Sequence, residues 1–160
     1  MVRLMGDHLS LVLLGVLGLF LLSAGIEDVR TREIANWKTA AIALLAPAWW
    51  WSIGIGLWPG AAIQLGVAAV VFAMFVGAFA LGMMGGGDVK LIGALALWLP
   101  PLATVSMLIV MSLVGGALTL VMLIEARMRR TGRAIEVPYG VAIAIAGLLA
   151  IREPIINQFG

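Results

Sequence analysis

The sequence predicts an all-α integral membrane protein with about six transmembrane helices, in a single domain that covers residues 1–160. Hydrophobic residues make up 63% of the chain and charged residues 11%, and the mean hydropathy is +1.14. A soluble domain is about 45–50% apolar and about 25% charged. Apolar stretches recur along the whole chain, and at about 20 residues per span they leave room only for short loops.

Charge-free stretches define each expected span. The first covers 9–26, which is too long for the apolar part of a signal peptide and is therefore expected to be retained. The others are expected at 39–57, 61–82, 88–99, 102–124 and 137–151. Helices are expected because backbone groups in hydrocarbon must be paired, and a barrel would show alternating segments of about 10 residues.

The basic residues predict the orientation. Eight of the ten lie in the loops 27–38, 83–90 and 125–136. The positive-inside rule places these loops in the cytoplasm and both termini outside, in a cytoplasmic (inner) membrane. Five tryptophans near the expected outer ends indicate an interfacial aromatic belt. They are Trp49, Trp50, Trp51, Trp58 and Trp98.

Composition also limits the chemistry. The chain has no cysteine and one histidine, His8, which precedes the first apolar run. Thiolate zinc sites, cysteine nucleophiles and Ser–His–Asp triads are therefore not expected, and neither is a metal or another cofactor. The net charge of +2 and the placement of the basic residues do not indicate a nucleic-acid partner, so the expected surroundings are the lipid bilayer.

The fourth span is too short. Its 12 residues, 88–99, would extend about 18 Å at about 1.5 Å per residue, against a hydrocarbon core of about 30 Å. Either the glycine-rich loop at 82–88 enters the membrane, or the helix begins upstream of Asp88. Irregular backbone at that depth must be buried in protein or face a water-filled cavity. The sequence therefore predicts a wet cavity that contains Asp88 and opens to the cytoplasm.

Asp28 and Asp88 are the strongest candidates for chemistry among the eight acids. Acids at a membrane boundary are costly and usually functional, and the predicted topology places both on one side. Two neighbouring carboxylates can share a proton, so that one acts as base toward water and the other as acid toward a carbonyl. Simpler interpretations stay open: Asp28 pairs with Arg30 or Arg32, and Asp88 caps a helix.

The neighbouring residues have weaker signals. Gly85, Gly86 and Gly87 permit close backbone approach beside Asp88, although glycines also serve tight helix packing. Lys90 either tunes Asp88 or simply extends to the interface. We expect the remaining loop acids, Glu27 and Glu33, to be solvated charges.

Three segments resemble motifs of the type IV prepilin peptidases. Residues 28–36, DVRTREIAN, resemble D-x-R-x-x-x-I-P-N, and residues 85–91, GGGDVKL, resemble G-x-G-D-x-K-L. The segment 137–142, VPYGVA, resembles the P-Y-G segment that opens the last helix of the family. The three matches occur in the family's order, and the resemblance extends over about residues 10–152.

This resemblance implies a membrane aspartic endopeptidase with a G-x-G-D core and with Asp28 and Asp88 as its catalytic residues. Its substrate would be a membrane-anchored prepilin, cut at the cytoplasmic face between a basic leader and the hydrophobic helix. The residues that would bind substrate or shape the cavity are Gly85, Gly86, Gly87, Lys90, Pro138, Tyr139 and Gly140.

Two features depart from the larger members of that family. Ala35 replaces the proline of the first motif, which is expected to loosen the loop. The chain has only a short segment before its first span and no cysteine. It is therefore similar to the peptidase-only form associated with Flp-type (tight-adherence) pili, and gives little support for methylation of the new pilin terminus. A homo-oligomer or a place in pilus-assembly machinery stays open.

Three other functions are compatible with the two acids. A presenilin-type peptidase also uses G-x-G-D, but pairs it with Y-D inside a span, whereas here Glu27 precedes Asp28. A cation-coupled transporter would use the acids as relay sites and would be supported by inverted repeats, of which none is clear. A non-catalytic subunit of a pilus-assembly complex would cleave nothing.

Overall fold

The computed structural model describes the backbone of residues 2–129 and 137–159, and the side chains of 8–128 and 137–152. Within these residues the protein contains six α-helices and no strand. The helices are α1 (Val2–Thr31), α2 (Asn36–Ser52), α3 (Ala62–Ala80), α4 (Gly86–Ala96), α5 (Pro101–Arg129) and α6 (Tyr139–Phe159), with a π-helical turn η1 (Leu57–Ala61) before α3. The predicted all-α fold class is confirmed.

Three segments are long and apolar enough to cross a membrane, judged by length and composition. They are His8–Thr31, Leu57–Ala80 and Pro101–Met128, and Tyr139–Arg152 is a shorter apolar helix. The two remaining helices, α2 and α4, have 17 and 11 residues. The chain is therefore a helical membrane protein, and the number of six spans stays a prediction.

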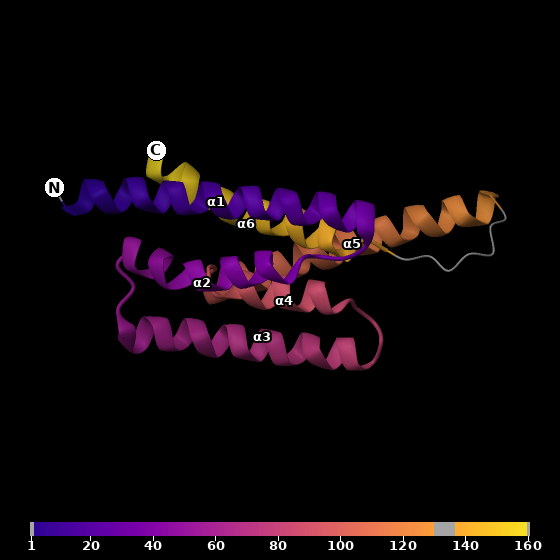
Figure 1. Ribbon diagram of the computed structural model, residues 1–160, viewed down its shortest axis with the longest axis horizontal. Coiled ribbons are helices and arrows are strands. Elements are labelled where there is room, and N and C mark those ends of the chain that lie inside the picture. The colour runs from indigo at the N-terminus through magenta and orange to yellow at the C-terminus, as the bar shows by residue number, and fades with distance from the viewer. Residues whose placement is uncertain (1, 130–136, 160) are drawn as a thin grey trace.

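Helix α4 lies at the centre of the bundle (Figure 1). It packs against α2, α3, α5 and α6, while α1 lies along α6, and α6 along α5. Eight of the 11 residues of α4 are buried. The two connections 32–35 and 81–85 lie at one end of the molecule, and the two termini lie toward the other. Asp28, near the end of α1, and Asp88, at the start of α4, therefore share one end.

Several predicted boundaries were wrong by a few residues. Helix α1 continues to Thr31 and α2 begins at Asn36, so the loop expected at 27–38 shrinks to residues 32–35. Helix α5 likewise continues to Arg129, and the rest of the expected loop, 130–136, lies outside the described residues. The cause is common to both: a charge marks where lipid ends, whereas the hydrogen bonds of a helix can continue past that point into water.

The central helix is too short to cross a bilayer by itself. Its 11 residues span about 16 Å at about 1.5 Å per residue. Side chains pair with the carbonyls at its end. From α2, Trp50 Nε1 donates to Leu97 O at 2.7 Å and Trp49 Nε1 to Trp98 O at 3.0 Å. From α3, Gln64 Nε2 donates to Ala96 O at 3.3 Å and also to Leu99 O. From α5, Thr104 Oγ1 donates to Leu99 O at 3.1 Å. Helix α4 can therefore end inside the protein, because these carbonyls have hydrogen-bond partners there.

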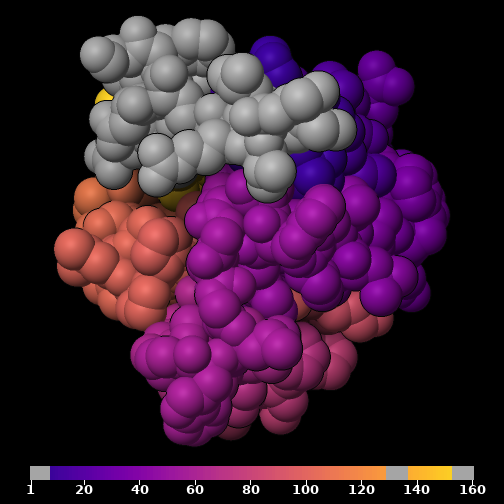
Figure 2. Space-filling view, turned by 90° about the vertical axis from the view of Figure 1, so that its left-hand side faces the viewer, coloured from indigo at the N-terminus to yellow at the C-terminus, as the bar shows by residue number. Residues whose placement is uncertain are grey.

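The predicted aromatic belt was wrong for three tryptophans. Trp49, Trp50 and Trp98 are only 5%, 9% and 3% exposed. The rings of Trp49 and Trp98 stack at 5.7 Å, and Trp98 Nε1 donates to Ile42 O at 2.8 Å. Their indole N–H groups thus join α4 to α2. Trp51 and Trp58 are exposed, near the end of the molecule that Figure 2 shows, where the connection from α2 to α3 occupies the centre of the face.

We expect Trp98→Phe to destabilise the protein by about 1–3 kcal/mol, because it removes the buried hydrogen bond to Ile42 O and replaces a buried indole by a smaller ring. The measurement is the unfolding midpoint of the detergent-solubilised protein in an SDS titration. Trp51→Phe is the matched control, since the Trp51 side chain is exposed, and it should change stability by less than about 0.5 kcal/mol. Equal shifts for the two variants would contradict this role of Trp98.

Candidate active site

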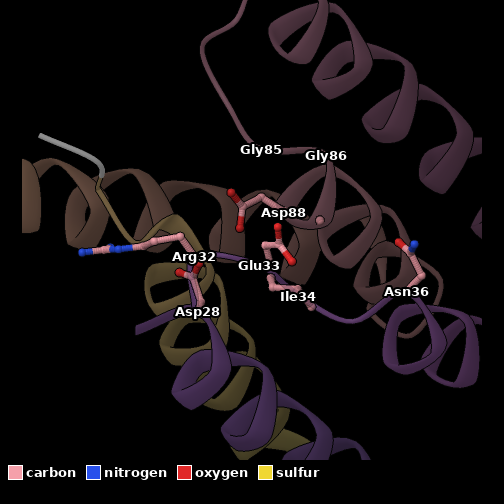
Figure 3. A pocket seen from close by; sticks show the side chains of 9 residues that line it. Asp28, Arg32, Glu33, Ile34, Asn36, Gly85, Gly86 and Asp88 are labelled. Atoms are coloured by element: carbon pink, nitrogen blue, oxygen red, sulfur yellow. The ribbon is translucent and has the colours of Figure 1, made fainter. Parts of the chain in front are cut away.

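The end of α1, the connection 32–35 and the start of α4 enclose a cavity of about 270 Å³ (Figure 3). Its lining residues are Asp28, Arg32, Glu33, Ile34, Asn36, Gly85, Gly86, Gly87 and Asp88. The structure thus brings both candidate aspartates to one cavity, from opposite walls. Arg32, Glu33, Ile34 and Asn36 were not singled out as site residues, although all four belong to the first motif.

Asp28 lies in the last turn of α1, and the start of α6 holds its carboxyl. The side chain is 5% exposed, and Oδ2 accepts a hydrogen bond from Val141 N at 3.3 Å. The backbone of Gly140 donates to the same carboxyl. The N-terminus of a helix attracts an anion through its free N–H groups and its dipole. No arginine forms an ion pair with Asp28 among the described residues.

Gly140 is needed for this contact. A Cβ atom at position 140 would lie 2.7 Å from Asp28 Cγ and 2.8 Å from Oδ2, which is far inside van der Waals contact. A larger residue would therefore push α6 and the Asp28 carboxyl apart. None of the three residues of the P-Y-G segment lines the cavity: Gly140 meets it only through Asp28, Pro138 is buried, and the Tyr139 ring packs against Gly115 of α5.

Asp88 is the third residue of α4, and its side chain is 9% exposed. Its carboxyl accepts a backbone hydrogen bond from Gly85, the residue that caps the helix. Asp88 therefore caps the helix and lines the cavity at the same time. The two carboxyls are close enough for the charge of Asp28 to act on Asp88. Because two buried like charges repel, the pair costs less energy when it holds one proton than when both groups are ionised.

Glycines let the two walls of the cavity touch. A Cβ atom at Gly87 would lie 3.1 Å from Ile34 Cβ and 3.3 Å from Ile34 N. At Gly85 it would lie 3.1 Å from Asp88 Oδ2. The chain reaches this position by a left-handed turn at Arg32, whose φ is +59°, a conformation that costs a non-glycine residue about 1 kcal/mol. The glycine run therefore allows the connection 32–35 to lie directly on the start of α4.

An ion pair fixes that connection from the other side. Lys38 Nζ lies 2.9 Å from Glu27 Oε2 and donates to Ser23 Oγ at 2.6 Å. The expectation that Glu27 is a solvated loop charge was wrong, because α1 carries it one turn further and under Lys38, which is 8% exposed. The two residues of this ion pair are 11 positions apart, and the sequence alone does not predict that they pair.

Ala35 does not loosen the loop. Its φ of −60° is a value that proline adopts, so the backbone keeps the shape that the family's proline would give. Its N–H donates to Glu27 Oε2 at 3.2 Å, which proline could not do. The substitution thus exchanges a rigid ring for a hydrogen bond to α1.

Lys90 lies outside the cavity. Its Nζ donates to Asn36 Oδ1 at 2.8 Å, and Asn36 lines the cavity. Lys90 can therefore influence the cavity only through Asn36 or through its charge. Among the described residues, no group of three or more His, Asp or Glu side chains is arranged to hold a metal ion.

These features define a helical membrane protein with a recessed pair of carboxylates between two helix ends. The sequence matches the type IV leader peptidase family over residues 15–120, about two thirds of the chain. The chain belongs to this family, and the resemblance inferred from its motifs is confirmed. The matched range includes Asp28 and Asp88, whereas the P-Y-G segment lies beyond it. Searches among curated proteins and among solved structures gave no match.

We expect Gly140→Ala to reduce leader cleavage by about 10- to 100-fold, because small displacements of a reacting group have effects of this size. The added Cβ would overlap the Asp28 carboxyl. The measurement is the initial rate of cleavage in detergent. Gly116→Ala is the control, since no atom lies within 4 Å of its added Cβ. Unchanged cleavage by Gly140→Ala would show that the contact does not position Asp28.

Proposed function

We propose that the chain is a membrane aspartic endopeptidase that removes the basic leader of type IV prepilins, of the Flp type, at the cytoplasmic face. Asp28 and Asp88 are its catalytic pair. The observation that carries this proposal is that both carboxylates line one cavity of about 270 Å³. The family supports the substrate class, and the two acids support the reaction, because peptide hydrolysis needs a base for water and an acid for the carbonyl.

The two carboxyls have different surroundings, which supports different roles. Asp28 accepts a hydrogen bond from the backbone N–H of Val141 at the start of α6, whereas Asp88 lies in the first turn of α4, within reach of the charge of Asp28. In the proposed reaction Asp28 takes a proton from water as the water oxygen attacks the scissile carbonyl carbon. Asp88 gives its proton to the carbonyl oxygen. When the tetrahedral intermediate collapses, the C–N bond breaks, the proton held by Asp28 passes to the leaving amine, and a hydroxyl of the new carboxyl group returns a proton to Asp88.

The charge of the cavity supports a basic leader. Glu33 is exposed and lines the cavity together with the two aspartates, against a single basic lining residue, Arg32 (Figure 3). With one proton shared by the two aspartates, the lining carries two negative charges against the positive charge of Arg32, and a hollow with a net negative charge attracts a cationic peptide. The basic residues near this end, Arg30, Arg32 and Lys38, support its placement in the cytoplasm by the positive-inside rule.

Single changes of either aspartate test the proposal. Asp28→Asn and Asp88→Asn should each lower cleavage of a purified prepilin by at least about 100-fold, because each removes one of the two proton-transfer groups. The measurement is the mobility shift of the processed pilin on a gel. Glu125→Gln is the matched control: it makes the same acid-to-amide change on α5, at a residue that does not line the cavity.

The outcomes separate the remaining functions. Normal cleavage by either aspartate variant would reject the catalytic pair. No cleavage by the unchanged protein would favour a transporter or a non-catalytic assembly subunit.

A further inference from the structure

A second hollow lies beside the acidic cavity. It is a groove of about 550 Å³ between α2 and α3, with α4 as its floor. Helices α2 and α3 both pack on α4 rather than on each other, so the groove is open to the outside of the bundle. Its walls include Ala40 and Ala43 of α2 and Leu65 and Ala69 of α3, and its floor includes Gly93 and Ala94.

Small side chains give the groove its depth. The side chains of the walls are short at Ala40, Ala43 and Ala69. On the floor, Gly93 leaves room for the Phe72 ring, because a Cβ atom at position 93 would lie 2.7 Å from that ring. Surfaces of this kind allow membrane helices to approach closely, because small residues bring the two backbones together. The groove therefore has the composition of a seat for one further apolar helix.

The groove adjoins the acidic cavity at Asn36. Asn36 lines both hollows, and Lys90, which lines the end of the groove, donates to Asn36 Oδ1 at 2.8 Å. A chain that leaves the cavity at Asn36 therefore reaches the end of the groove at the Asn36–Lys90 pair. The order of environments is an acidic hollow followed directly by an apolar channel.

We infer that the groove seats the transmembrane helix of the substrate while the extended segment before it lies in the cavity. This inference rests on the proposed function. A substrate with a basic extended segment followed at once by an apolar helix matches the two hollows in both chemistry and order. The helix is then held by the protein rather than by lipid alone, and its seat determines which peptide bond lies between the two aspartates.

Filling the groove tests the inference. Ala69→Trp places a large ring in the groove, and Val70→Trp places the same ring at an exposed position of the same helix that does not line the groove. The two substrates are a full-length membrane-anchored prepilin and a soluble peptide that contains the leader and the scissile bond without the helix. Initial cleavage rates are measured for both substrates with each protein.

We expect Ala69→Trp to cleave the anchored prepilin at least about tenfold more slowly, the loss of about 1.4 kcal/mol of binding, while peptide cleavage stays at the unchanged rate. Val70→Trp should cleave both substrates normally. Normal cleavage of the anchored prepilin by Ala69→Trp overturns the inference and leaves the proposed function intact. If the unchanged protein cleaves neither substrate, the proposed function itself fails.

Cross-linking provides a readout that does not depend on activity. A photoreactive benzoylphenylalanine is placed at position 69 or at position 70 in the Asp88→Asn variant, so that the substrate stays uncleaved. We expect position 69 to couple to the apolar helix of the anchored prepilin and position 70 to couple to lipid. Coupling from position 69 only to lipid, or to a second copy of the chain, overturns the inference.

Discussion

The arrangement of the helices in this protein depends on one central helix, α4, that is too short to cross the bilayer. Because α4 has only 11 residues, the backbone groups at both of its ends must find partners inside the protein. At one end, side chains of α2, α3 and α5 donate to its carbonyls. At the other, glycines bring the connection 32–35 against its first turn. The recess that contains Asp88 exists because the helix stops short of the surface.

The two aspartates sit in unlike electrostatic positions. Asp88 is near the N-terminus of α4, where the helix dipole favours a negative charge, whereas Asp28 is near the C-terminus of α1, where the dipole opposes one. The start of α6 offsets that disadvantage through Gly140 and Val141. Three helix ends therefore meet at the cavity, and each carboxyl faces the N-terminus of one helix.

Local sequence predicted the fold class, the short fourth helix and the placement of Asp28 and Asp88 at the same end of the molecule, because hydropathy and the positions of acids are visible one segment at a time. It did not predict that Trp49, Trp50 and Trp98 are buried. Their indole N–H groups donate to backbone carbonyls that only the packing of α2 against the end of α4 brings near. In the sequence, a tryptophan near the end of a span is equally compatible with an interfacial belt and with a buried core position. The pairing of Glu27 with Lys38 and the contact of Gly140 with Asp28 likewise require knowledge of which helix ends meet.

The residues that contact the Asp28 carboxyl come from a distant part of the chain. The family match ends at residue 120, while the N–H groups that hold the Asp28 carboxyl come from residues 140 and 141. A fragment that stopped at the family boundary would keep both acids and the glycine run, yet its first carboxylate would lack its backbone donors. The structural unit that holds both carboxyls is thus longer than the matched range, and α6 completes it.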